Sequence, residues 1–103
     1  MSYQTKEQSI GYLLHGALKC EKLPASELVT IALEAVDVVP KSTNLINDDT
    51  LKFIRIIGEK IKLDEEQVKQ WKSEVYWAFD MRTVEEAQHT FDAFAQLFPV
   101  LRN

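Results

Sequence analysis

The residues of this sequence best suited to nucleophilic chemistry are one cysteine and two histidines. Attack by a thiolate needs Cys20 beside an imidazole that takes its proton, and a third group that orients the imidazole. His15 lies five positions before Cys20, and on a helix that spacing turns the two side chains about 140° apart. No motif supports a pairing of Cys20 with His89. We therefore expect that the protein is not an enzyme and that Cys20 packs as a small hydrophobic residue.

The stretch EAQH, residues 86–89, has the Glu-x-x-His spacing of di-iron helical bundles. Such a site needs two of these pairs and two further glutamates that point into the bundle, and the pair occurs once here. Phosphate-binding loops are excluded because the three glycines are isolated from one another. The sequence therefore predicts no metal and no cofactor.

The composition is typical of one folded domain, with 103 residues, 46% of them hydrophobic and 27% charged. The net charge of −4 argues against a uniformly basic surface for nucleic acid. A single cysteine cannot form an internal disulfide, which fits a reducing compartment. No apolar run is long enough to span a membrane. We expect a cytoplasmic protein with no membrane partner, and the negative net charge disfavours nucleic acid as its partner without excluding a local basic patch.

The elements that position these residues are expected to be helices. A capping box, in which a hydroxyl or carboxylate residue is followed three positions later by Glu or Gln, occurs at Thr5, Asp64 and Thr83. These boxes predict helices over about residues 6–21, from Asp64 onward, and from Thr83 to Pro99. With two further helices between the first and second boxes, residues 1–103 are predicted to form one all-α bundle of about five helices.

The apolar residues that follow each capping box repeat with helical spacing and are expected to face the core. In the first helix they are Ile10, Leu13, Leu14, Ala17 and Leu18. After Asp64 they are Val68, Trp71, Val75, Ala78 and Phe79. After Thr83 they are Val84, Ala87, Phe91, Phe94 and Phe98. Gly11 and Gly16 in the first helix lower its stability by about 1 kcal/mol each relative to alanine, so we expect them to permit close approach of a neighbouring element.

The segment between residues 48 and 63 has two readings. Asp48 and Asp49 favour the start of a helix through its dipole, and Leu51, Ile54, Ile57 and Ile61 follow with helical spacing. The same segment is rich in β-branched residues, so a β-hairpin over residues 52–63, turning near Gly58, is the alternative. The sequence favours the helix and leaves the hairpin open.

The segment LPASELVTIALEAVDVVP, residues 23–40, predicts a helix that is apolar around most of its circumference. At about 100° per residue, its polar residues form one narrow stripe of Glu27, Thr30, Glu34 and Asp37. Such a helix is central in its fold or lies in an interface. Three environments remain open for it: the centre of the domain, a homodimer, and contact with a partner protein.

Part of this segment resembles the TraM-type quorum-sensing anti-activators. The matching residues lie within 23–36 and are Leu23, Pro24, Leu28, Thr30, Ile31 and Ala35, with acids at Glu27 and Glu34. Members of that family are small α-helical dimers that bind a LuxR-type transcription factor and stop it from engaging DNA. The resemblance implies that this chain is an anti-activator whose partner is a transcription factor.

The stretch LDEEQVKQWKSE, residues 63–74, resembles the start of a homeodomain recognition helix. It lacks the asparagine and arginines that read bases and hold phosphates after Trp71, and Glu74 would face a polyanion. Lysines and an arginine upstream nevertheless keep one alternative function open. It is a DNA-binding, helix-turn-helix-like regulator that uses residues 50–72.

Large aromatic residues off the core stripe are candidates for contact with a partner. Trp77 lies about 180° from Val68 on the predicted helix, among polar neighbours. We expect Trp77, Tyr76, Met81 and Glu74 to bind a partner protein. The alternative is that this helix is packed between two neighbours and buries both faces. The sequence thus predicts a non-enzymatic regulator or inhibitor that occupies the surface of another protein.

Overall fold

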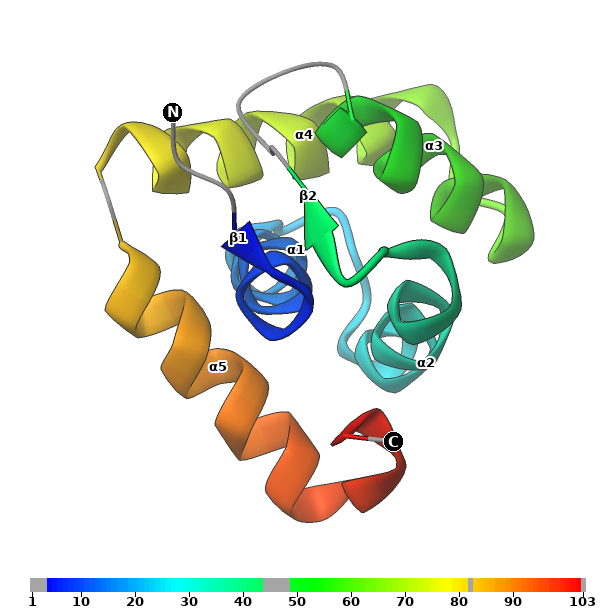
Figure 1. Ribbon diagram of the computed structural model, residues 1–103. Coiled ribbons are helices and arrows are strands. Elements are labelled where there is room, and N and C mark those ends of the chain that lie inside the picture. The colour runs from blue at the N-terminus through cyan, green and yellow to red at the C-terminus, as the bar shows by residue number, and fades with distance from the viewer. Residues whose placement is uncertain (1–3, 44–48, 82, 103) are drawn as a thin grey trace.

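The computed structural model describes residues 4–43, 49–81 and 83–102. Within these ranges the five α-helices are α1 (Lys6–Lys19), α2 (Leu28–Val38), α3 (Asp49–Lys60), α4 (Glu65–Asp80) and α5 (Val84–Leu97). Two short 3-10 helices, η1 (Ala25–Glu27) and η2 (Pro99–Arg102), precede α2 and follow α5. The two-residue strand β1 (Gln4–Thr5) pairs antiparallel with β2 (Ser42–Thr43). The predicted all-α bundle is confirmed (Figure 1).

Two of the three predicted capping boxes are confirmed. The Thr5 hydroxyl accepts a hydrogen bond from the Gln8 backbone N–H at 3.1 Å, and Gln8 Oε1 accepts one from the Thr5 N–H at 3.2 Å. Asp64 and Gln67 exchange the same pair of bonds at 2.8 and 2.9 Å. Each pair satisfies two backbone donors that the first turn of a helix leaves free, which fixes where α1 and α4 begin.

The third predicted capping box, at Thr83, is wrong. Thr83 does precede α5, but its side chain caps no backbone N–H of that helix. Its hydroxyl instead donates a hydrogen bond to the Ala78 carbonyl at 3.0 Å. The tight connection from α4 to α5 therefore uses the hydroxyl to close the end of α4.

The segment that had two readings is a helix. Residues Asp49–Lys60 form α3, so the hairpin alternative is wrong, while the predicted start at Asp48 lies outside the described residues. The chain turns at Lys62, whose φ of 60° is left-handed. The Leu63 N–H donates to the Gly58 carbonyl at 2.9 Å and the Lys62 N–H donates to the Glu59 carbonyl at 3.3 Å. These two bonds make a Schellman motif, which ends α3 and leads into α4.

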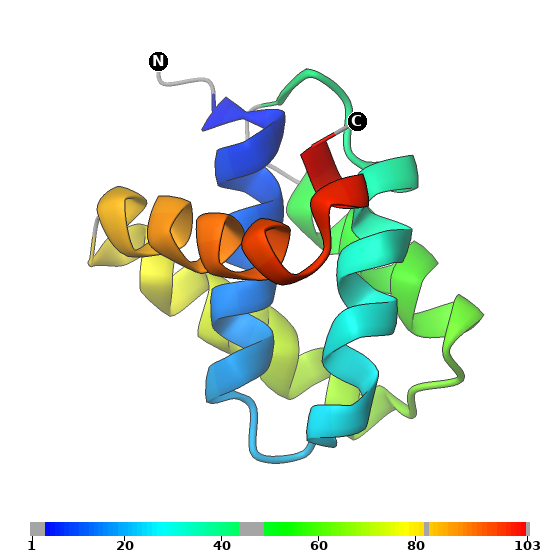
Figure 2. The ribbon, with the colours of Figure 1, turned by 90° about the horizontal axis from the view of Figure 1, so that it is seen from below.

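Helix α1 occupies the centre of the bundle, with α4, α5 and α2 packed around it (Figures 1 and 2). Figure 2 shows α5 crossing α1 steeply while α2 runs beside it. A Cβ on Gly11 would overlap the Ala87 carbonyl of α5, and a Cβ on Gly16 would overlap the Val75 side chain of α4. The expectation that these glycines permit close approach is confirmed, because both neighbours lie where a larger side chain would stand.

Helix α2 lies at the periphery, between α1 and α3, so the central position left open for it is excluded. Its inner face buries Ile31, Ala32 and Ala35. Leu33 on the outer face is 43% exposed. The side chain of Lys60 in α3 forms an ion pair with Glu34 at 2.9 Å, which joins the polar stripe of α2 to α3. None of the helices in the described ranges is long and apolar enough to cross a membrane.

Candidate protein-binding surface

Helix α4 carries all four residues that the sequence proposed for partner contact. Its inward face is set by Trp71, Val75 and Ala78, which are fully buried. The Trp71 indole N–H donates to the Leu13 carbonyl of α1 at 2.8 Å, and this buried bond fixes the rotation of α4 about its axis. Trp77 follows Trp71 by six residues, which places it about 240° around the helix. It therefore points outward and is 56% exposed.

A shallow hollow of about 380 Å³ lies against the Trp77 side chain. Ser73 and Glu74 of α4 and Lys19, the last residue of α1, complete its lining. Met81 follows Trp77 by one helical turn and is 57% exposed. We call these five residues the Trp77 surface. It combines two large apolar side chains with one acid and one base, the mixture found where an interface core meets its polar rim.

Tyr76 lies on the other flank of α4. Its ring centroid is 6.3 Å from that of Phe79, and Phe79 in turn lies 4.4 Å from Tyr12 of α1. Lys72 Nζ stands 5.8 Å from the centroid of the Tyr76 ring. The structure therefore divides the predicted contact residues into the group Trp77, Met81 and Glu74 and the separate, half-buried Tyr76.

Two residues expected in the core are exposed instead. Leu18 near the end of α1 is 51% exposed, and Val84 at the start of α5 is 39% exposed. Both lie in a terminal turn, where the neighbouring helices no longer cover the apolar stripe. Leu18 directly precedes Lys19 of the Trp77 surface. Sequence reasoning missed the contribution of α1 because nothing in the pattern shows that its last turn lies beside α4.

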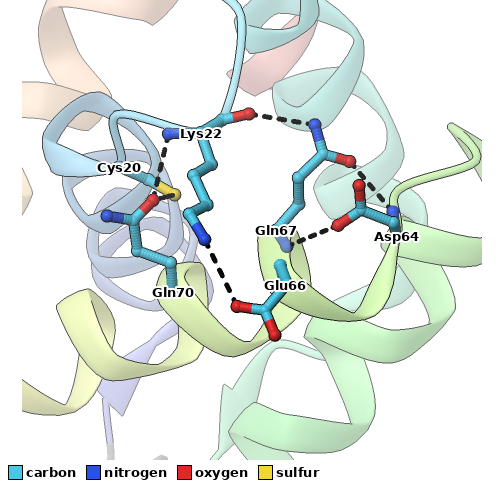
Figure 3. Close-up of polar contacts among 6 residues, drawn as sticks. All are labelled: Cys20, Lys22, Asp64, Glu66, Gln67 and Gln70. Atoms are coloured by element: carbon cyan, nitrogen blue, oxygen red, sulfur yellow. Dashed lines mark hydrogen bonds and ion pairs between the residues drawn. The ribbon is translucent and has the colours of Figure 1, made fainter.

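A polar clamp holds the first turns of α4 against the loop that follows α1 (Figure 3). Gln70 Oε1 accepts hydrogen bonds from the Cys20 thiol at 3.1 Å and from the Lys22 backbone N–H at 3.0 Å. Gln67 Nε2 donates to the Lys22 carbonyl at 2.9 Å, and Lys22 Nζ pairs with Glu66 at 3.2 Å. The clamp reinforces the position of the helix that bears Trp77.

Cys20 belongs to this clamp and is only 3% exposed. Burial raises the pKa of its thiol above the ordinary value, which keeps the sulfur in its less reactive protonated form at neutral pH. His15 lies 3.6 Å from Glu86, and His89 is exposed on α5. Among the described residues, no group of three or more His, Cys, Asp or Glu side chains could hold a metal ion.

Three of the eight residues that resemble the TraM-type anti-activators are core positions. Leu23, Ile31 and Ala35 are buried, whereas Pro24 and Thr30 are exposed. Packing of a peripheral helix on α1 and α3 is sufficient to require aliphatic residues at the buried positions. The resemblance therefore gives little information on which surface would meet a partner.

Comparisons of the chain with protein-family models, with curated proteins and with solved structures found no match. A functional proposal for this chain must therefore rest on its own residues. The strongest of these observations is the exposure of Trp77 and Met81 on a helix whose opposite face is tightly packed.

Proposed function

We propose that the protein is a non-enzymatic regulator or inhibitor that binds another protein through the Trp77 surface. The observation that carries the proposal is that the indole of Trp77 is 56% exposed, although Trp71 on the same helix is fully buried. Tryptophan is enriched among residues that dominate binding energies, and exposed examples on a rigid helix need no reorganisation before contact.

The area available at Trp77 is large enough to matter energetically. A half-exposed indole leaves on the order of 100 Å² of mainly apolar surface, and burying it contributes about 2–3 kcal/mol at ~25 cal/mol per Å². That value reaches the range of an interface hot spot, which is about 2 kcal/mol or more. Met81, one turn away and 57% exposed, adds a flexible apolar contact beside it.

Charge around the Trp77 surface favours a partner with a basic rim. Glu74 and Asp80 lie three positions before and after Trp77, on the same side of α4, and the chain carries a net charge of −4. Lys19 is the cation within the hollow. Complementary charge of this kind mainly sets the association rate and partner choice, while the apolar contacts supply affinity.

The finer assignment is that the partner is a transcription factor and the chain its anti-activator. It rests on the resemblance of residues 23–36 to the TraM-type family. Its test is addition of the pure protein to a LuxR-type factor from the same host bound to its operator DNA. Release of the DNA in proportion to added protein is the expected result, and unchanged DNA binding would contradict it.

The alternative of a DNA-binding regulator that uses residues 50–72 receives less support. Recognition helices contact bases with their N-terminal residues, and α4 begins with the exposed acids Glu65 and Glu66. Both would lie against phosphates. That alternative requires retention on duplex DNA at low salt, with affinity that falls steeply as salt is added.

The experiment that tests the proposal compares immobilised wild-type protein with Trp77→Ala and with Leu97→Ala. Leu97 is the matched control, because it is 74% exposed but lies on α5, away from α4. Host lysate is passed over each, and bound proteins are identified by mass spectrometry. We expect one protein to be retained by the wild type and by Leu97→Ala but not by Trp77→Ala. The circular dichroism spectrum of each variant should match that of the wild type, which shows that the variants are folded. Equal retention by Trp77→Ala would contradict the proposal.

A further inference from the structure

A second surface lies on the flank of α4 that faces α3. It is a groove of about 630 Å³ between the two helices and the turn that joins them. Its apolar lining is made of Gly58, Leu63 and Val68. Gly58 is buried, and a Cβ at that position would stand 3.1 Å from Val68 Cγ2. The absence of a side chain at Gly58 therefore lets α3 and α4 approach closely beside the groove.

The charged residues of the groove are sorted by sign along its length. The acids Glu59, Asp64 and Glu65 lie next to the turn, and the cations Arg55, Lys69 and Lys72 lie farther along the two helices. Among the described residues, none of the three cations forms an ion pair. Asp64 Oδ1 accepts the hydrogen bond that caps α4, which holds this carboxylate in place, so Asp64 adds to the negative charge of Glu59 and Glu65 at this end of the groove.

A ligand of one charge sign does not fit this arrangement. A polyanion such as nucleic acid, or a fatty-acid carboxylate, would satisfy the cations but would meet Glu59 and Glu65 at the other end. A ligand with an acid, an aliphatic middle and a base matches the whole groove. We propose that the groove binds a short peptide segment of a partner protein with that order of side chains.

Helix geometry sets the length of the segment. Glu65 and Lys72 are separated by a rise of about 10 Å along α4, at ~1.5 Å per residue. An extended peptide advances ~3.3 Å per residue, and only every second side chain lies on the same face. Its acidic and basic residues should therefore be about four positions apart, the even spacing nearest to this rise, with one aliphatic residue midway between them. The Trp77 surface lies on the opposite flank of α4, so this inference goes beyond the proposed function and does not depend on it.

The probe that tests the inference is the blocked synthetic peptide Ser-Glu-Ser-Leu-Ser-Lys-Ser, added to the ¹⁵N-labelled full chain and followed by NMR. We expect shifts concentrated at the amides of Gly58, Leu63 and Val68. Control peptides in which both charged positions are Glu, or both are Lys, should bind about tenfold more weakly, because each brings one like-charge contact. Trp77→Ala should bind the probe as the wild type does, so failure of one proposal is separable from failure of the other.

The double variant Lys69→Glu, Lys72→Glu leaves Arg55 as the one cation among the described residues that line the groove, against five acids. It should lose the probe and bind the doubly basic peptide instead, a gain that a misfolded chain would not show. The inference is overturned if no peptide moves the groove amides, or if the doubly acidic peptide or duplex DNA binds the wild type as well as the probe does. It is also overturned if these amides shift with protein concentration alone, since a second copy would then occupy the groove.

Discussion

The two tryptophans of α4 lie six residues apart on one helix and have opposite environments. Trp71 is fully buried and its N–H is bonded to the Leu13 carbonyl, whereas Trp77 is 56% exposed beside Lys19. Amino-acid type is the same in both cases, so the difference comes from rotation around the helix. α4 thus packs into the core on one face and exposes a large aromatic side chain on the other.

Helices α1 and α2 also show that residue type alone does not decide which parts of the chain lie at the centre of the fold. α2 is the more aliphatic of the two, but α1 occupies the centre of the fold. The buried residues of α1 include Gly11 and Gly16, and the absence of a side chain there lets α5 and α4 pack against its backbone. Two glycines inside one helix, turned about 140° apart, are therefore a better sign of a central helix here than aliphatic content is.

The largest effect expected from this comparison is at Trp71. Trp71→Ala should lower the free energy of unfolding by about 3–5 kcal/mol, because it leaves a cavity at the centre of the core. Trp77→Ala, the control on the same helix, should change it by no more than about 0.5 kcal/mol. Urea denaturation monitored by circular dichroism measures both. Similar losses for the two variants would contradict the assignment of one indole to the core and the other to the surface.

An intermediate effect is expected where α5 packs on α1. Gly11→Ala would normally stabilise a helix by about 1 kcal/mol. Here the added methyl group overlaps the Ala87 carbonyl, and a backbone must move, so we expect a net loss of about 2–3 kcal/mol. Thermal unfolding by calorimetry gives the difference. Lys52→Ala, at an exposed position of α3, is a control in which no overlap occurs. A stabilised Gly11→Ala variant would show that α1 and α5 are farther apart than described.

Local chemistry made much of this fold predictable. The capping boxes at Thr5 and Asp64 depend only on residues three positions apart. The apolar stripe through Trp71 and Val75 depends only on the period of the helix. Both can therefore be found from the sequence alone. The box at Thr83 failed because its hydroxyl is taken by the Ala78 carbonyl, a contact set by the turn between two helices.

The candidate surface was predictable only in part. The outward direction of Trp77 follows from its angle to the core stripe, as does that of Glu74 relative to Trp77. The position of Lys19 against Trp77 depends on how α1 and α4 pack, which no local pattern contains. The α3–α4 groove was missed for the same reason, since its charges become one site only when two helices lie side by side.

The smallest effect concerns the turn that places α4 against α3. Lys62 has a φ of 60°, a left-handed conformation that costs a non-glycine residue about 1–2 kcal/mol. Glycine avoids that cost, but it has more conformational freedom to lose on folding, which lowers the stability by about 0.5–1 kcal/mol. Lys62→Gly should therefore raise the free energy of unfolding by about 0.5–1 kcal/mol. The same change at Lys52, an exposed position inside α3, should lower it by about 1 kcal/mol. Urea denaturation of both variants measures these changes. A lower free energy of unfolding for Lys62→Gly would contradict the prediction, because it would mean that the lysine side chain stabilises the turn by more than the left-handed backbone costs.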